Sequence, residues 1–339
     1  MRTALVTGAT GMVGSYIVER LARDGWRVRA LARRPVARSW LDALGAEVRD
    51  GDILDAGALT AAAAGCEAIF HAAAAIGPRG DWEPYRLGNV QGTSNVIDVA
   101  ARVGARLAHV SSTAVYGADT RWRDQPTDEM VDLPPIPESD PYARSKLEAE
   151  RLVLEAASSG RVWATVVRPP PMYGCRDRQL IPRIAPILDR GVFPLIAGGR
   201  STLTIVHAGS VADGAVRAAT TDGALGRAYN LTNDGAITVA EFVRLASVGL
   251  GRRIFTPTIP YAAGRAAMKT LAMALTVIGR AHLAPHTTGL LDLLTRDNPF
   301  SSERARRELG WAPTVSHADA VPEAFRWWRA HHGRANART

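Results

Sequence analysis

The sequence predicts an α/β protein: a doubly wound parallel sheet with helices on both faces, followed by a smaller, mostly helical C-terminal lobe. Three observations predict it. Short apolar or β-branched runs alternate with longer amphipathic runs through the first two-thirds of the 339 residues, which is typical of βαβ units. A glycine-rich turn separates the first such run from the first amphipathic one. After Pro169 the alternation is lost, so we expect the chain to leave the sheet there.

Each element follows from this alternation in order. Strands are expected at residues 3–7, 27–32, 47–50, 68–70, 107–111 and 161–167, and helices at 12–24, 83–103 and 142–158. Two later runs, 203–206 and 228–231, are predicted to return to the sheet. From Gly235 onward the pattern is helical, with Ser301 as the expected N-cap of a helix over 303–309.

Composition and charge exclude several classes of protein. The chain is 47% hydrophobic and 22% charged, as globular domains are, and its two cysteines cannot form a disulfide framework. The formal net charge of +8 comes from scattered arginines without interleaved aromatic residues, so nucleic-acid binding is not expected. The histidines are dispersed, and no metal site is predicted. The opening MRTALVTG has no secretory pattern and no apolar run could span a bilayer, so we expect a cytoplasmic location.

The segment TGATGMVG, residues 7–14, predicts a dinucleotide-binding turn. Gly8 permits the tight turn, Gly11 lets the backbone approach a pyrophosphate, and Gly14 lets the helix pack on the strand. The helix N-terminus then offers unpaired N–H groups to phosphate, so we also expect Thr10, Met12 and Val13 in the cofactor site. The alternative is a glycine-rich connector without a ligand.

The expected domains follow from these elements. Residues 1–174, with returns about 203–232, are predicted to form the dinucleotide-binding domain. Residues 175–202 and 233–330 are predicted to form the substrate-binding lobe, and residues 331–339 a tail.

The end of the second predicted strand indicates the cofactor. An acidic side chain at this point accepts from the ribose of NAD, whereas arginine suits the 2′-phosphate of NADP. Here Arg33 and Arg34 stand at the strand end without a carboxylate, which favours NADP. If the two arginines form only a solvated turn, NAD is the alternative.

Tyr142 and Lys146 are the predicted catalytic pair. Their spacing of four places the phenol and the amine on one helix face, where we expect the ammonium to lower the pKa of the phenol for acid/base chemistry. Ser111 and Ser112 end the strand over 107–111 at the carboxyl edge of the sheet, and Ser112 could donate a hydrogen bond to a substrate oxygen beside Tyr142. The alternatives are a surface Tyr/Lys pair and a serine that only caps a turn.

Together, the three glycines with Ser112, Tyr142 and Lys146 resemble the extended short-chain dehydrogenase/reductase (NAD-dependent epimerase/dehydratase) superfamily, most closely its 3β-hydroxysteroid dehydrogenase branch. The resemblance covers the chain to about residue 328. It implies a Rossmann-type fold and a hydride transfer in which Tyr142 is the acid/base, Ser112 binds the substrate oxygen and Lys146 holds the nicotinamide ribose. The further cofactor contacts that it implies are Asp52 and Ile53 at the adenine, and Ala72, Ala73, Ala74, Asn89, Ser111 and Pro169.

Two departures bear on the substrate. Pro171 stands where nucleotide-sugar enzymes often carry an asparagine that contacts phosphate. Residues 259–281 form an apolar helix-like segment similar to one in sterol dehydrogenases, where a lipid-like substrate or peripheral membrane contact is met; an ordinary buried helix is the alternative. We therefore expect an NADP-dependent dehydrogenase or ketoreductase of a hydrophobic secondary alcohol or ketone, steroid-like or polyketide-like. The alternatives are a nucleotide-sugar 4-epimerase or 4-ketoreductase and a non-catalytic NADP-binding protein. The resemblance also implies a homodimer packed through the helices at 83–103 and 142–158.

Overall fold

A computed structural model describes residues 1–33, 38–76, 81–117, 128–233, 237–277, 291 and 293–332. The chain divides into two compact units. The first holds Met1–Pro170, Ala208–Leu231 and Ser301–Thr314, and the second holds Pro171–His207, Thr232–Phe300 and Val315–Thr339.

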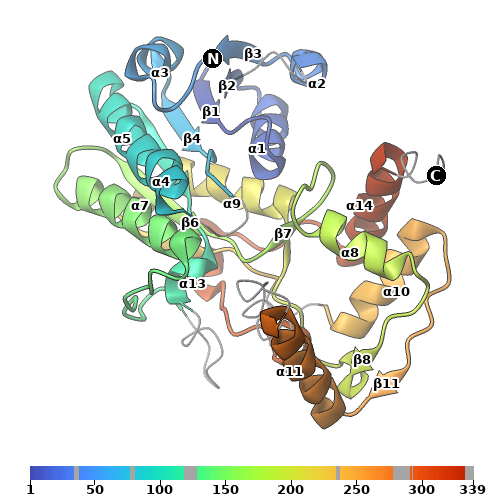
Figure 1. Ribbon diagram of the computed structural model, residues 1–339. Helices are drawn as coiled ribbons and strands as arrows, with labels where there is room; N and C mark the ends of the chain where they lie inside the picture. The colour runs from blue at the N-terminus through green and yellow to red at the C-terminus, as the bar shows by residue number, and fades with distance from the viewer. Residues whose placement is uncertain are drawn as a thin grey trace. The chain divides into compact units, whose positions relative to one another are not determined.

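The first unit is built on a seven-stranded parallel sheet (Figure 1). Its strand order is β10-β6-β5-β4-β1-β2-β3, so the chain starts in the middle and the order reverses between β1 and β4. Ligands bind at such a reversal, outside the carboxyl ends of the strands. The strands are β1 (Thr3–Thr7), β2 (Arg27–Ala32), β3 (Glu47–Asp50), β4 (Ala68–His71), β5 (Arg106–Val110), β6 (Ala164–Arg168) and β10 (Ala228–Asn230).

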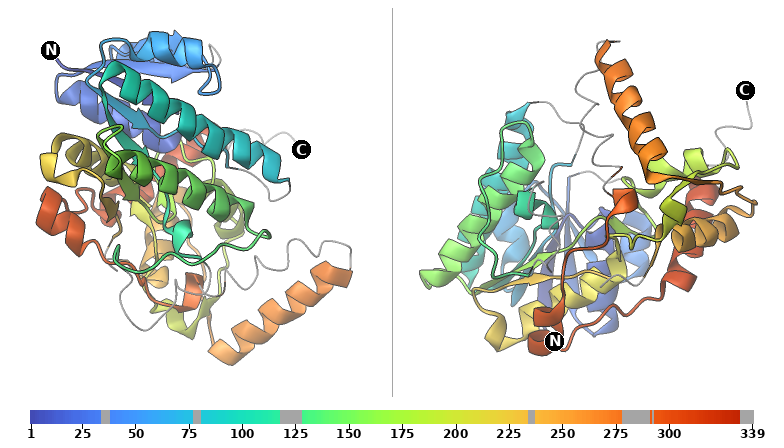
Figure 2. Two further views of the ribbon diagram at one scale, coloured as in Figure 1. Left: turned by 90° about the vertical axis from the view of Figure 1, so that its left-hand side faces the viewer. Right: turned by 90° about the horizontal axis from the view of Figure 1, so that it is seen from below.

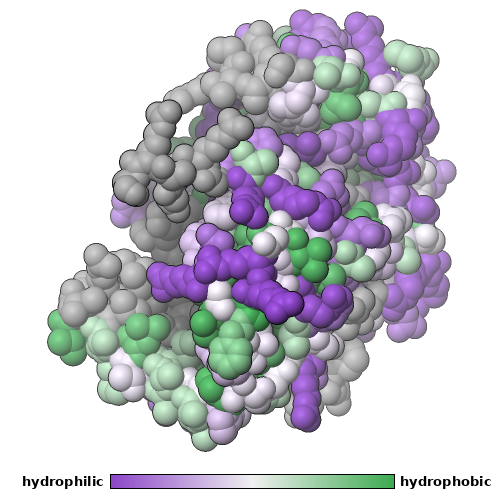
Figure 3. All heavy atoms as spheres, turned by 90° about the vertical axis from the view of Figure 1, so that its right-hand side faces the viewer, coloured by the Kyte–Doolittle hydropathy of each residue, from purple (hydrophilic) through white to green (hydrophobic). Residues whose placement is uncertain are grey.

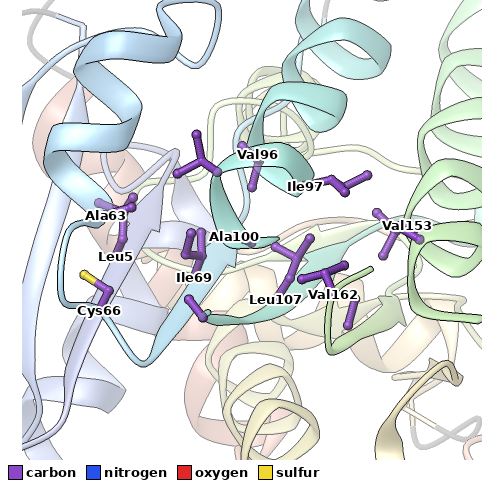
Figure 4. Close-up of a cluster of buried hydrophobic side chains, with 14 of the residues drawn as sticks. Leu5, Ala63, Cys66, Ile69, Val96, Ile97, Ala100, Leu107, Val153 and Val162 are labelled. Carbon is purple, nitrogen blue, oxygen red and sulfur yellow. The ribbon is translucent and has the colours of Figure 1, made fainter. Parts of the chain in front are cut away.

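Helices cover both faces of this sheet, as the alternating pattern predicts. One face packs on α3 (Ala56–Ala63), α5 (Gly92–Val103) and α7 (Pro141–Ser158), and the other on α1 (Met12–Arg23) and α9 (Ala208–Thr220). Figure 4 shows the apolar layer on the first face, where Leu5, Ile69 and Leu107 of three adjacent strands meet Val96 and Ile97 of α5. The unit also contains the α-helices α2 (Arg38–Ala43), α4 (Trp82–Tyr85) and α13 (Glu303–Leu309).

The helix expected over 83–103 is continuous but not regular. It consists of α4, a π-helical turn at Arg86–Gln91 and α5. Such π-helical turns are frequent at functional sites. This one carries Asn89, whose side chain is described below.

Residues 301–314, which the sequence analysis placed in the substrate lobe, pack in the first unit. Trp311 explains this, because its fully buried ring lies there and its Nε1 donates to the Ser210 carbonyl at 2.9 Å. At the start of α13 the N-cap position is Ser302, while the Ser301 hydroxyl accepts from the Glu303 N–H at 3.2 Å.

The second unit has its own core and two small parallel sheets. β7 (Met172–Tyr173) pairs with β9 (Val206–His207), and β8 (Leu195–Ile196) pairs with β11 (Thr258–Ile259). The run at 203–206 therefore does not return to the large sheet as expected, because its Val206 N–H bonds to the Pro171 carbonyl beside β7. Within the described ranges its helices are α8 (Ile181–Leu188), α10 (Val239–Leu250), α11 (Tyr261–Val277) and α14 (His317–His332). α14 extends two residues into the predicted tail.

The apolar segment predicted at 259–281 forms α11 as far as Val277, and residues 278–281 lie outside the described ranges. Among its described side chains most are exposed, including the apolar Leu271, Met273 and Val277. The buried-helix alternative is therefore not what the described residues show. Figure 2 shows α11 in orange, and apolar surface gathers at the lower left of Figure 3, where this helix lies.

Candidate active site

The glycine turn is built so that only glycine fits at two of its positions. Gly8 has φ +70°, and a Cβ there would lie 2.5 Å from the Ala73 nitrogen. A Cβ on Gly14 would lie 2.1 Å from the Gly8 carbonyl oxygen. The turn therefore runs against both the segment after β4 and the start of α1, which leaves backbone rather than side chains at the strand end.

The N-terminus of α1 is available to an anion. Gly11 is its N-cap, no side chain caps it, and its first turn carries no acidic residue. The N–H groups of Met12 and Val13 lie in this first turn, where partial positive charge accumulates. Thr10 lies in the turn itself. Together these residues fit the pyrophosphate of a dinucleotide.

The structure places Arg33 directly after β2, with a side chain that is 81% exposed. Its Nε lies 4.0 Å from an Asp52 oxygen, while the other Asp52 oxygen accepts from the Leu54 N–H. Ile53 is held by Asn95, which donates to its carbonyl at 2.9 Å. Arg34 lies outside the described residues. Arg33, Asp52 and Ile53 thus lie around the ends of β2 and β3.

The segment after β4, which contains Ala72, Ala73 and Ala74, is anchored by Asn89. The buried Asn89 amide accepts from the Ala75 N–H at 2.6 Å and donates to the Ala75 carbonyl and to the Ser145 hydroxyl. Its polar atoms are committed to the protein, so Asn89 would shape the cofactor site through the Ala75 backbone. At the neighbouring strand end, the Pro169 carbonyl accepts from the Thr113 N–H.

Ser112 and Tyr142 are brought together by two different elements. Ser112 follows β5, and its Oγ accepts from the Ala114 N–H. Tyr142 lies in the first turn of α7, which begins here because the Asp140 carboxylate caps the Ala143 N–H and Pro141 occupies the first turn. The Ser112 hydroxyl lies close enough to the Tyr142 phenol to lower its pKa. A proton donor and a second hydroxyl thus share one point at the carboxyl edge of the sheet.

The electrostatics of Tyr142 differ from expectation. Burial raises the pKa of its phenol; the nearby Ser112 hydroxyl lowers it, and Asp140 and Tyr85 raise it further. Lys146 is not among the groups that shift this pKa, so the predicted lowering by the ammonium is not seen. The reason is that the Lys146 Nζ donates instead to the Val110 carbonyl at 2.7 Å.

Lys146 is itself perturbed. It is 2% exposed, and burial lowers its pKa to about 8, partly opposed by the Glu150 carboxylate. Glu150 forms a buried ion pair with Arg168, whose Nη1 donates to the Tyr116 hydroxyl at 2.8 Å. Because Glu150 lies on α7 and Arg168 ends β6, these contacts hold the helix against the end of the strand.

A buried polar row that the sequence pattern did not predict lies below the site. Thr7, His71 and His109 are register partners on β1, β4 and β5, so their side chains share one face of the sheet. The His71 ring contacts the Thr7 hydroxyl at 2.7 Å and the Thr93 hydroxyl at 3.0 Å. The signal in the sequence is a histidine at or next to the last position of two apolar strands, His71 of β4 and His109 of β5.

The residues present fit a dinucleotide cofactor on structural grounds. A Cβ at Gly8 or Gly14 would fill the glycine cradle, and no side chain caps the N-terminus of α1. Within the described residues no three His, Cys, Asp or Glu side chains gather as a metal site would require. Among the helices that the structure describes, none has the length and apolar character to cross a bilayer.

Comparisons with known proteins agree with this geometry. The model of the NAD dependent epimerase/dehydratase family matches residues 4–232. The chain is 34% identical over 326 residues to a 4-hydroxy-2-methyl-3-oxo-4-farnesyl-3,4-dihydroquinoline-1-oxide ketoreductase of Stigmatella aurantiaca, covering 95% of each chain. It is 29% identical to a 3 beta-hydroxysteroid dehydrogenase/Delta 5-->4-isomerase of Mycobacterium tuberculosis, covering 96% of this chain and 90% of the relative. The crystal structure of gox2253 superposes with a TM-score of 0.76 at 30% identity, covering 98% and 99% of the two chains.

Proposed function

The chain belongs to the NAD-dependent epimerase/dehydratase family, and on that premise we propose that it is an NADPH-dependent reductase of hydrophobic ketones. It is an NAD(P)-dependent oxidoreductase of the extended short-chain type. The observation that carries the proposal is the pairing of the Ser112 and Tyr142 hydroxyls at the carboxyl edge of the sheet, close enough for Ser112 to act on the pKa of the phenol. Oxidation of the matching secondary alcohol is the reverse reaction.

The chain's own residues would bind the substrate oxygen and transfer one proton to it. When bound, the nicotinamide cofactor supplies or accepts the hydride. The Ser112 hydroxyl orients the substrate carbonyl, and the Tyr142 phenol, which burial keeps protonated at neutral pH, donates its proton to that oxygen. Lys146, fixed by the Val110 carbonyl, lies one helical turn further along α7 and would hold the ribose.

The preference for NADP rests on Arg33. β2 ends at Ala32 without a carboxylate, and the exposed Arg33 guanidinium has only a 4.0 Å contact with Asp52. A guanidinium in this position suits a 2′-phosphate. We expect Arg33→Ala to weaken NADPH binding about tenfold or more while NADH binding changes little, measured by calorimetric titration. Arg161→Ala is the matched control, because Arg161 is an exposed arginine in an ion pair with Asp98 at the far end of β6. Equal losses for NADPH and NADH would contradict the proposal.

The hydrophobic substrate class rests on two features of this chain. Pro171 offers no hydrogen-bond donor where a phosphate-binding amide would be needed for a sugar nucleotide. The second unit carries the exposed apolar helix α11. The two relatives are named for substrates of the same chemical class, a farnesyl-bearing dihydroquinoline-1-oxide ketone and a 3β-hydroxysteroid.

A thermal-shift and turnover panel tests the class. The protein with NADPH is offered steroid ketones, alkyl 3-oxoacyl compounds and aromatic ketones, with UDP- and dTDP-sugars as the contrasting arm. We expect oxidation of NADPH with hydrophobic ketones and no stabilisation by nucleotide sugars. Stabilisation by a nucleotide sugar alone would replace the proposal with a 4-epimerase or 4-ketoreductase activity.

We also propose a homodimer formed through α5 and α7, from the family resemblance. Light scattering at several protein concentrations tests it.

A peripheral contact with anionic lipid is proposed for α11. Its charged residues are Arg265 and Lys269, and apolar residues of the same helix are exposed. Co-sedimentation with phosphatidylserine vesicles tests this contact, and Met273→Glu is expected to abolish it.

A further inference from the structure

One polar group in the buried row below the site has no partner. Both ring nitrogens of His109 lack a hydrogen bond within the described residues, although His109 is 1% exposed. Two residues further along the chain, just past the end of β5, the Ser111 N–H still bonds to the Val167 carbonyl of β6, so its side chain lies on the same face. The Ser111 hydroxyl is also buried and unpartnered in the described part of the chain. A buried imidazole and a buried hydroxyl left unpaired are each destabilising, so native proteins pair such groups or hydrate them.

Lys146 reaches the strand between these two residues. Its ammonium carries three N–H groups, and one donates to the carbonyl of Val110, the residue that separates His109 from Ser111. Within the described chain this carbonyl is the acceptor that the structure gives for Lys146. Lys146 is also one of the groups that lower the pKa of His109, so its ammonium lies near the two unpartnered side chains.

We propose that Lys146, His109 and Ser111 share one buried water, and that His109 is thereby a positioning residue for the Lys146 ammonium. A water needs two to four polar partners to be stable inside a protein, and these three side chains provide them. The water accepts from the Lys146 ammonium and donates to the His109 imidazole and the Ser111 hydroxyl. This shared water concerns the proposed function at Lys146. Its relevance to catalysis rests on that function, whereas its presence does not.

His109 is suited to this role because it is neutral. Burial lowers its pKa well below the ordinary value, and Lys146 and His71 lower it further. A neutral imidazole always keeps one nitrogen with a free lone pair. The His71 ring, whose centroid lies 5.2 Å from that of His109, contacts a threonine hydroxyl with each of its nitrogens. His71 therefore needs no water as a partner.

Charged groups near Lys146 also affect its pKa, so their contribution must be distinguished from that of the shared water. The charged or titratable groups that interact with Lys146 are His71 of β4, His109 of β5 and Glu150 of α7. Arg168 of β6 is paired with Glu150, and Tyr85 of α4 packs against the Tyr142 ring. Glu150 is already paired with Arg168, and the facing residues of β1 and α5, Thr7 and Thr93, do not titrate. Replacing His109 by an uncharged residue therefore changes hydrogen bonding to Lys146 without changing any charge near it.

The chain offers a direct measurement, because Lys146 and Lys269 are its only lysines. Labelling with [¹³Cε]lysine gives two signals, Lys269→Arg assigns them, and a pH titration of the cofactor-free protein reports the Lys146 midpoint. Loss of the water-mediated acceptor destabilises the ammonium, so we expect His109→Phe to lower the midpoint by about one pH unit. Ser111→Ala should lower it by less, and His109→Gln, which keeps a polar acceptor, should stay closer to the wild type.

Val166→Ala is the matched control, because Val166 is the apolar register partner of His109 on β6. It removes packing volume at the same level of the sheet and should leave the midpoint unmoved. An unchanged or raised midpoint in folded His109→Phe would overturn the inference. If His109→Phe does not fold, an unchanged midpoint in Ser111→Ala would do so. The titration needs neither cofactor nor substrate, so failure of the ketone assays would not affect the measured Lys146 midpoint. Likewise, an unchanged midpoint would overturn the shared water without contradicting the ketone reductase activity.

Discussion

Replacing Gly14 by alanine tests whether the glycine turn is the dinucleotide site. The added Cβ would lie 2.1 Å from the Gly8 carbonyl oxygen and 2.7 Å from the Gly8 carbonyl carbon. Ordinary contact begins near 3.4 Å, so the turn and α1 must separate by about 1 Å. The obstacle is backbone, which cannot rotate away as a side chain could. A displacement of about 1 Å in a positioning element costs on the order of 100-fold in the function that it supports.

We therefore expect Gly14→Ala to weaken NADPH binding by about 100-fold and to destabilise the fold by about 1–3 kcal/mol. Calorimetric titration measures the first effect, and thermal denaturation measures the second. Gly223→Ala is the control, since a Cβ there meets nothing within 4 Å and its φ requires no glycine. Wild-type affinity for NADPH in folded Gly14→Ala would refute the assignment of the turn.

Three further predictions concern other parts of the site. Tyr142→Phe should lower ketone turnover by about 10²- to 10⁴-fold with NADPH affinity retained, which separate kinetic and binding measurements check. Glu150→Ala should destabilise the protein by about 3–5 kcal/mol in urea unfolding, because it leaves Arg168 buried and uncompensated; a loss below about 1 kcal/mol would contradict the buried pair. Burial lowers the pKa of His71 to about 3, so the unfolded state binds more protons than the folded state between about pH 3 and 6.5. The free energy of unfolding should therefore fall as pH falls through this window, and it should fall less steeply in His71→Asn.

Strands could be predicted from the sequence wherever burial on both faces leaves a continuous apolar run. The first three have the predicted bounds, and β4 extends one residue further, to His71. β6 begins at Ala164 rather than at residue 161, because the chain still turns there after Gly160, whose φ is +70°. The pairing of β7 with β9 joins residues more than thirty apart, and local periodicity carries no information about such pairs.

The candidate site shows the same division between local and tertiary information. Spacing predicts that Tyr142 and Lys146 share a helix face, and the strand-end motif predicts Ser112 at the edge of the sheet. Spacing could not predict that the Lys146 amine bonds to Val110, since that depends on how α7 docks on β5. For the same reason the polar row through Thr7 and His71 was not foreseen, because only the sheet register aligns residues that lie far apart in the chain.

A crystal structure of the NADP⁺ complex tests the central claim most directly. The account predicts the pyrophosphate at the first turn of α1, and the nicotinamide beside the Ser112 and Tyr142 hydroxyls, with room for a carbonyl group at about 3–3.5 Å from the reacting ring carbon. A dinucleotide bound away from the glycine turn, or a Tyr142 hydroxyl directed away from its nicotinamide, would contradict it.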